Sequence, residues 1–209
     1  MLNRGATKEA MLKFGYRWSN IPGTLQEIQE INKLFVGSKI ITGKNVTEAN
    51  LKSLSKSGDL KKYRVLHFAT HGLVVPDVPE LLSIVLSLFK NPKDNEDGYL
   101  TMKEILKLVL ECEFVNLSAC ETGLGKITGG EGIVGLTQSF LLSGANGIFV
   151  SLWQVADNST MVFMVGLYKL VKEKEIGYRE ASIEMKRKFI KDKEFASPYY
   201  WAPFVYYGR

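Results

Sequence analysis

The sequence predicts one α/β domain built around a mainly parallel sheet with helices on both faces. The first observation is length, because 209 residues are enough for one well-packed domain and few for two. The second is composition: 45% hydrophobic and 23% charged residues are close to the values of globular proteins. The third is pattern, since short apolar runs alternate with longer segments of helical periodicity.

The first half of the chain is expected to hold two helices and three strands. Thr24 and Glu27 have the spacing of a capping box, in which each side chain accepts a hydrogen bond from a backbone N–H of the first helical turn. Thr47 is the cap expected for the second helix. The expected elements are a helix at 24–36, a strand at 39–42, a helix at 47–57, a buried strand at 63–70 and, within a long loop at 73–98, an edge strand at 81–89.

The second half alternates helices and strands more regularly. Thr101 is expected to cap a helix, and glycine-rich chain at 123–132 leads into the next one. Asp157 or Ser159 caps the helix after that. The expected elements are a helix at 101–110, a strand at 113–119, a helix at 132–142, a strand at 147–155, helices at 157–172 and 178–191, and a last strand at 204–207.

Charge and targeting features exclude several classes of protein. The net charge is +5, and the one mild basic cluster, at 186–193, is interpreted as a solvated helix face. The alternative is a weak patch for nucleic acid or an acidic partner, but its only aromatic residue is Phe189, which is too little for base stacking. The sequence has no run of about 18 apolar residues and no secretory signal pattern. We therefore expect a cytoplasmic protein that contacts no membrane and binds no nucleic acid directly.

Two expected strand ends carry the residues from which catalysis is predicted. In a parallel α/β sheet, functional groups lie at the carboxyl ends of the strands. One such end holds His71, and another holds Cys120, 49 residues later. A neighbouring histidine raises the thiolate fraction of a cysteine, so Cys120 is the candidate nucleophile and His71 the candidate general base. The backbone N–H groups of Gly72 and Cys120 are the candidate oxyanion-hole donors.

Other interpretations of these residues stay open. A cysteine at a strand end also occurs as a small buried hydrophobic residue. His67 is a rival base, since it lies four residues before His71 on the same side of the strand, although a supporting role suits it better. Cys112 lies in a polar segment between two glutamates. Because there is no Cys-x-x-Cys pair and no histidine pair at ligand spacing, the sequence predicts neither a metal site nor a disulfide framework.

Seven stretches of the chain form a recognisable set of motifs. The two most specific are VLHFATHG at 65–72, which holds His71, and LSACETGLG at 117–125, which holds Cys120. Together with the other five, they resemble the CHAT domain family, the caspase-like domains associated with TPR repeats and related to caspases and separases. The resemblance extends from about residue 19 to the end of the sequence. The other five are IPGT at 21–24, TEANLK at 47–52, GGEGIVGL at 129–136, SLWQV at 151–155 and PYYWAPFV at 198–205.

The resemblance implies a three-layer α/β/α caspase-like fold with a His–Cys dyad formed by His71 and Cys120. The spacing of the two is similar to the spacing of about 50 residues in caspases. The caspase pentapeptide is not reproduced, because Ser118 replaces its glutamine and Glu121 follows the cysteine. A preference for aspartate at the P1 position of the substrate is therefore not implied.

Acidic residues near the motifs are candidates for a substrate pocket. Asp157, Glu131 and Glu121 could form an acidic S1 pocket that binds a basic P1 side chain. Their alternative roles are a helix cap for Asp157, a charge at a helix amino end for Glu131 and an exposed loop charge for Glu121. Trp153 is expected to line the substrate groove or to belong to the core. The aspartate pair common in the family reads Ala156-Asp157 here, so any role of the first aspartate is lost.

The sequence as a whole predicts a cysteine endopeptidase that cleaves protein substrates through an acyl-enzyme, without a metal or an organic cofactor. Residues 1–18 are expected to be an N-terminal extension or the remnant of a first helix and strand, and residues 19–209 the CHAT (caspase-like) peptidase domain. The resemblance implies activation by a ligand or by a TPR-containing or other regulatory partner, and hence low activity of the isolated chain. The alternative is a non-catalytic caspase-like interaction module in a larger regulatory assembly.

Overall fold

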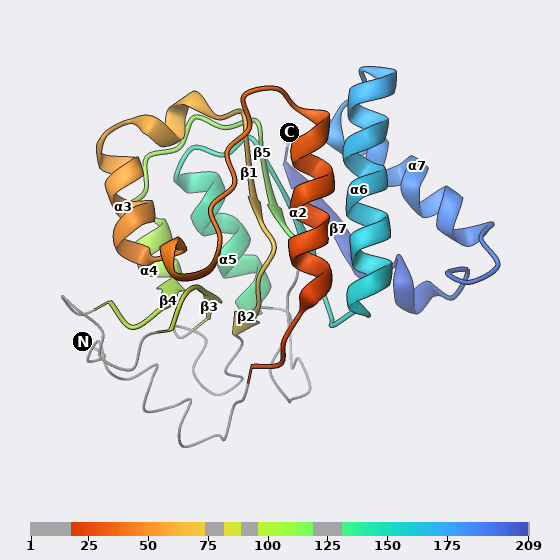
Figure 1. Cartoon of the computed structure of the whole chain (residues 1–209), viewed down its shortest axis with the longest axis horizontal. Coiled ribbons are helices and arrows are strands. Elements are labelled where there is room, and N and C mark those ends of the chain that lie inside the picture. The colour runs from red at the N-terminus through yellow and green to blue at the C-terminus, as the bar shows by residue number, and fades with distance from the viewer. Residues whose placement is uncertain (1–17, 74–81, 89–95, 119–130, 209) are drawn as a thin grey trace.

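The computed structural model describes residues 18–73, 82–88, 96–118 and 131–208 (Figure 1). Its centre is a four-stranded sheet of order β1-β5-β6-β7. Strands β1, β5 and β6 run parallel and β7 pairs antiparallel with β6, which confirms the prediction of a mainly parallel sheet. The strands are β1 (Val65–Phe68), β5 (Phe114–Leu117), β6 (Gly147–Ser151) and β7 (Phe204–Gly208).

A smaller antiparallel sheet follows directly after β1. Its order is β2-β3-β4, and its strands are β2 (Gly72–Leu73), β3 (Ser83–Val85) and β4 (Tyr99–Thr101). Only residues 69–71 separate β1 from β2. His71, the last of these three, therefore lies where the chain leaves the central sheet and enters the smaller one.

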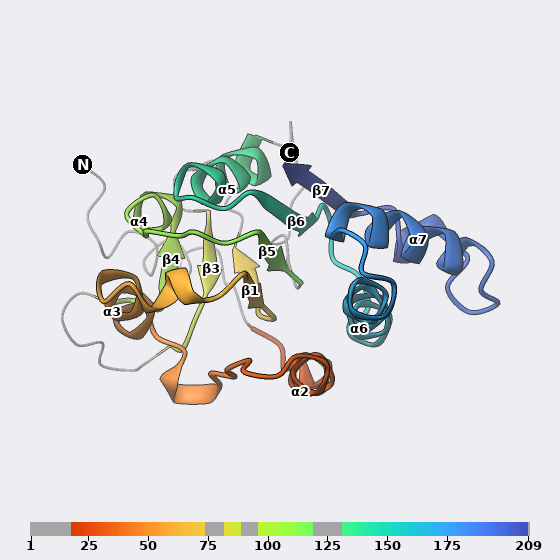
Figure 2. The same ribbon diagram turned by 90° about the horizontal axis from the view of Figure 1, so that it is seen from above.

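Helices cover both faces of the central sheet. Figure 2 shows α2 and α6 on one face and α4 and α5 on the other, which confirms the predicted α/β fold and its three layers. No helix in the described part of the chain is long and apolar enough to cross a membrane. The α-helices are α2 (Pro22–Leu34), α3 (Glu48–Lys56), α4 (Met102–Ile105), α5 (Glu131–Leu142), α6 (Asp157–Lys174) and α7 (Tyr178–Ile190), and the 3₁₀ helices are η1 (Gly43–Asn45), η2 (Asp59–Lys62) and η4 (Pro198–Tyr200).

Two hydrophobic cores lie on opposite faces of the central sheet. Successive residues of a strand point to opposite faces, and β5 and β6 follow this rule. Val115 and Ile148 belong to the core that includes α5, whereas Phe114 and Phe149 belong to the core that includes α6 and α7. Both strands are buried along their whole length, as is typical of central strands in parallel sheets. Strand β1 is half-buried and pairs on one side only among the described strands.

The helix caps agree with the sequence in two places and differ in two, one of which is α6, where neither Asp157 nor Ser159 forms a cap hydrogen bond. Thr47 and Thr101 cap α3 and α4 as expected, and Thr101 does so within a capping box. Thr24 and Glu27 form no such box, because α2 begins at Pro22, a residue favoured in the first turn of a helix. Glu27 points into the core instead and is only 1% exposed.

Two further expectations about secondary structure are wrong. Residues 39–42 form no strand and are largely exposed, because no strand among the described residues lies beside them to pair with. The helix expected at 101–110 ends at Ile105. Leu108 and Leu110, which follow it, are both buried. A spacing of two residues between buried side chains suits extended chain rather than a helix.

Candidate active site

His71 lies at the carboxyl end of β1, where the sequence predicts the catalytic base. Its side chain is buried, with 8% of the residue exposed. Its backbone carbonyl accepts a hydrogen bond from Val85 N at 2.8 Å, which ties the segment to β3. The chain enters α2 at this same end of the sheet, beside β2 (Figure 1). The residues that precede α2 can therefore contact the His71 ring.

The imidazole of His71 is oriented by a backbone carbonyl. Nε2 of His71 lies 2.8 Å from the carbonyl oxygen of Ser19. A carbonyl oxygen can only accept a hydrogen bond, so Nε2 carries the proton, and in the neutral ring the lone pair is on Nδ1. This nitrogen is therefore the one that can act as a base.

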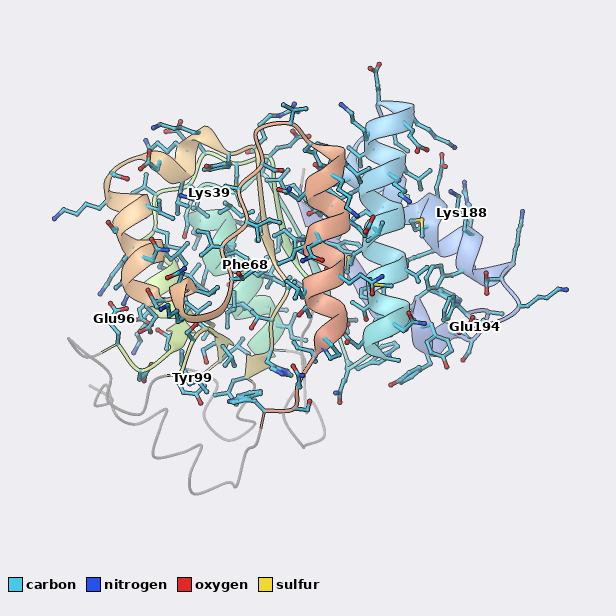
Figure 3. The ribbon with its side chains drawn as sticks, viewed as in Figure 1. Lys39, Phe68, Glu96, Tyr99, Lys188 and Glu194 are labelled. Carbon is cyan, nitrogen blue, oxygen red and sulfur yellow. The ribbon has the colours of Figure 1, made fainter. Side chains whose placement is uncertain are left out.

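Aromatic residues pack around the same ring. The Trp18 ring lies against the imidazole, with centroids 5.0 Å apart and planes tilted by 33°. Trp18 Nε1 in turn donates to the Tyr99 hydroxyl at 3.3 Å. Figure 3 labels Tyr99 at this end of the molecule, next to the start of α2. Sequence reasoning missed Trp18 and Ser19, which lie in or next to the expected N-terminal extension and belong to none of the recognised motifs.

The N–H of Gly72 points away from the strand with which β2 pairs. Gly72 lies opposite Ile84 in the antiparallel ladder. Because Val85 N donates to His71 O, this opposite pair is a non-hydrogen-bonded one. The Gly72 N–H is thus not used by β3 and faces the other edge of β2, as an oxyanion donor requires.

The strand that leads to Cys120 lies directly beside β1. The two strands run parallel, with Leu117 opposite Phe68. Ser118 N donates to Phe68 O at 3.0 Å, which extends the pairing by one residue. His71 follows Phe68 by three residues, and Cys120 follows Leu117 by three residues. Cys120 itself lies outside the described residues.

Asp157 contacts the start of a neighbouring helix. Its Oδ2 accepts a hydrogen bond from Gly23 N at 2.6 Å, in the first turn of α2. Asp157 is also the first residue of α6, so a single carboxylate lies at the amino ends of two helices. Such a position is favourable for a negative charge. The half-buried Asp157 thus caps α2. The prediction that Asp157 or Ser159 caps α6 is wrong, because the N-cap residue of α6 is Ala156 and no side chain forms a cap hydrogen bond there.

The other predicted pocket residues are only partly described. Trp153 is half-buried in the loop after β6, and its Nε1 donates to Tyr199 O at 3.2 Å. Glu131 is the first residue of α5, while Glu121 lies outside the described residues.

His67 lies apart from His71, and its imidazole contacts two helices. Its Nε2 lies 2.7 Å from Glu27 Oε1, and its Nδ1 lies 3.1 Å from the Tyr168 hydroxyl. Both ring nitrogens therefore have partners, on α2 and α6. A pocket of about 470 Å³ beside β1 is lined by His67 and by residues of α2 and α3, but not by His71.

The second cysteine, Cys112, is a poor nucleophile. Cys112 is 1% exposed, and burial raises the pKa of its thiol to about 11. The described residues contain no group of three or more histidine, cysteine or acidic side chains that could hold a metal ion.

Known proteins are similar to this sequence along nearly its whole length. The CHAT domain family matches residues 5–209. Tetratricopeptide repeat protein 28 of Homo sapiens is 25% identical over 222 residues, which cover 91% of this chain and 8% of that protein. Its Mus musculus counterpart is 26% identical over 223 residues, covering 91% and 9%. The chain thus spans less than a tenth of the length of these relatives. The family match covers almost every residue, and the protein therefore belongs to the CHAT domain family.

Proposed function

We propose that this chain is a cysteine endopeptidase with Cys120 as nucleophile and His71 as general base. The observation that supports this proposal most is the register of two adjacent parallel strands. Phe68 and Leu117 lie opposite each other, and the two reactive residues follow at equal distances along the chain. Equal offsets from a paired position support a location of both side chains at the same edge of the sheet, which a nucleophile and its base require.

The proposed reaction begins at the thiol. His71 accepts the Cys120 proton at Nδ1, and the thiolate sulfur attacks the carbonyl carbon of the scissile peptide bond. The Gly72 and Cys120 N–H groups stabilise the oxyanion of the tetrahedral intermediate. The imidazolium then gives its proton to the leaving amine as the C–N bond breaks. Water, deprotonated by His71, hydrolyses the thioester and releases the acid and the free thiol.

The Ser19 carbonyl is the proposed third member of the catalytic group, because it orients the His71 imidazole. It fixes the tautomer in which Nδ1 of His71 is the base, and its partial negative charge stabilises the imidazolium that forms during the reaction. The sequence identifies no third member of the catalytic group, because a backbone carbonyl has no side-chain signature. A dyad whose histidine is oriented by a backbone carbonyl needs no metal and no organic cofactor for the proposed reaction.

For the substrate, we propose an acidic S1 pocket and a groove wall from the predicted residues. The acidic candidates are Glu121, Glu131 and Asp157, of which Asp157 already accepts a hydrogen bond from Gly23 N in α2. Trp153 is the candidate for the wall. The proposed peptidase domain is 19–209. Because both relatives are tetratricopeptide repeat proteins, we propose a TPR-containing or other regulatory protein as the activating partner.

The proposal is tested with thiol-reactive peptidyl probes that carry arginine, lysine or aspartate at P1. Wild type is expected to label at Cys120, with Cys120→Ala and His71→Ala unlabelled and a basic P1 preferred. Candidate TPR partners are added in parallel, because we expect low activity for the isolated chain. If no probe labels Cys120 under any of these conditions in folded protein, the chain is the non-catalytic interaction module instead.

A further inference from the structure

The carbonyl that orients His71 belongs to the short segment that enters α2. Ser19 lies three residues before Pro22, at which α2 begins. Ile21, two residues after Ser19, is tied to the first turn of α2, because the N–H and Oγ1 of Thr24 both donate to Ile21 O, at 3.2 and 2.7 Å. Pro22 restricts the backbone of the same turn further. A shift in the first turn of α2 therefore displaces the carbonyl to which His71 donates.

We propose that Asp157 is a positioning residue for His71: it fixes the first turn of α2, and with it the Ser19 carbonyl that selects the tautomer of the imidazole. The inference rests on the proposed function, in which Nδ1 of His71 accepts the proton of Cys120. It assigns Asp157 a role in orienting the base rather than in contacting the substrate.

Asp157 supplies a cap that α2 cannot supply for itself. The first N–H groups of a helix have no partner within the helix, and Ile21, at the N-cap position, has no side-chain oxygen to offer. Asp157 Oδ2 takes the place of such a cap by accepting from Gly23 N at 2.6 Å. A Cβ at Gly23 would lie 2.6 Å from Asp157 Cγ, so the approach depends on glycine at this position.

A second contact holds the rest of α2 in place. Glu27 lies four residues after Gly23 and therefore on the same face of the helix. It is buried, and it contacts His67, which in turn contacts Tyr168 on α6. A buried carboxylate is stable only when it is paired, so this chain of contacts fixes the second turn of α2. Loss of Asp157 is thus expected to loosen the first turn alone and to leave the fold intact.

The test measures the tautomer of His71 directly. Long-range ¹H–¹⁵N spectra of the imidazole rings distinguish Nε2–H from Nδ1–H forms at a pH at which the ring is neutral. The chain has only two histidines, and the spectrum of His71→Ala assigns them. Wild type is expected to show mainly the Nε2–H form. In Asp157→Ala, the ratio of Nε2–H to Nδ1–H is expected to fall by about two- to tenfold, as for the loss of one hydrogen bond.

Three further variants separate the proposed role from others. Gly23→Ala breaks the same contact while Asp157 remains at the start of α6, so its ratio is expected to fall as in Asp157→Ala. Asp157→Asn keeps an acceptor oxygen and is expected to retain most of the wild-type ratio. Asp192→Ala is the matched control, since Asp192 also accepts backbone N–H bonds, at 2.7 and 3.0 Å, but lies near Glu194, far from Tyr99 and the site (Figure 3).

The outcomes also separate this inference from the proposed function. A wild-type tautomer ratio in folded Asp157→Ala or folded Gly23→Ala overturns the positioning role. Circular dichroism and thermal unfolding show whether each variant is folded, and the glycine variant provides the measurement if the aspartate variant is not. A shifted ratio in a protein that no peptidyl probe labels would support the positioning role and contradict the peptidase.

Discussion

Glu48 makes the stability of this protein depend on pH in a way that one substitution can remove. The side chain is 1% exposed at the start of α3, and its Oε2 has no hydrogen-bond partner among the described residues. Burial is the largest cause that raises its pKa, from 4.5 to about 8, and the neighbouring Glu104 adds to the effect. Lys52 acts in the opposite direction. At neutral pH the folded protein therefore holds a proton on Glu48.

The sign and the size of the effect follow from these two pKa values. Between pH 4.5 and about 8, the folded state binds the Glu48 proton and the unfolded state does not. Stability contributed by this proton is complete at low pH and is lost as the pH rises through that window, by at most about 1.4 kcal/mol per pH unit. The whole window amounts to an upper bound on the order of 5 kcal/mol. Above about pH 8 the contribution of Glu48 no longer changes.

The assay is urea unfolding of wild type and Glu48→Gln at several pH values from 5 to 9. Glutamine is neutral throughout, so the variant is expected to gain stability relative to wild type as the pH rises, by a few kcal/mol between pH 5 and 8. Glu111→Gln is the control, because the Glu111 side chain is 63% exposed in a surface pair with Lys61. Parallel stability profiles for wild type and Glu48→Gln would refute the reasoning.

Three further predictions concern the core and the second cysteine. Cys112, with a pKa of about 11, is expected to resist iodoacetamide at pH 7.5 in the folded protein and to react in urea, as peptide mass spectrometry can show. Phe140 is fully buried, so Phe140→Ala should lower the unfolding free energy by about 3–5 kcal/mol in urea titrations. Gly144 has φ +108° and a Cβ there would overlap the Leu110 carbonyl oxygen, so Gly144→Ala should cost about 3 kcal/mol or more by thermal unfolding, while retention of wild-type stability would contradict the geometry.

Much of the fold is predictable because it depends on local patterns. The apolar runs that become β5 and β6 are buried on both faces, and continuous apolar runs indicate such strands. Thr47 caps α3 as its residue type predicts. The capping box expected at Thr24 and Glu27 is absent because α2 begins at Pro22, and the Glu27 carboxylate contacts a distant partner, His67, in the core instead. No local pattern reports a contact of that kind.

The candidate site, like the fold, is predictable only where it depends on local sequence patterns. The position of His71 at a strand end follows from the alternation of strands and helices and from its sequence motif, whereas Cys120, predicted in the same way, lies outside the described residues. The Ser19 carbonyl could not be predicted, since every residue has a backbone carbonyl. The contact between Gly23 and Asp157 joins residues 134 positions apart and has no signature in either segment. Long-range contacts of backbone groups therefore complete the site beyond what the sequence indicates.

The most direct test of the dyad is the rate at which Cys120 is alkylated as a function of pH in wild type and in His71→Ala. Mass spectrometry of the peptides follows Cys120 separately from the buried Cys112. If His71 and Cys120 interact, wild-type Cys120 reacts with an apparent pKa below the usual value of about 8.5, and the substitution returns the profile to that value. Identical profiles in two folded proteins would contradict the dyad.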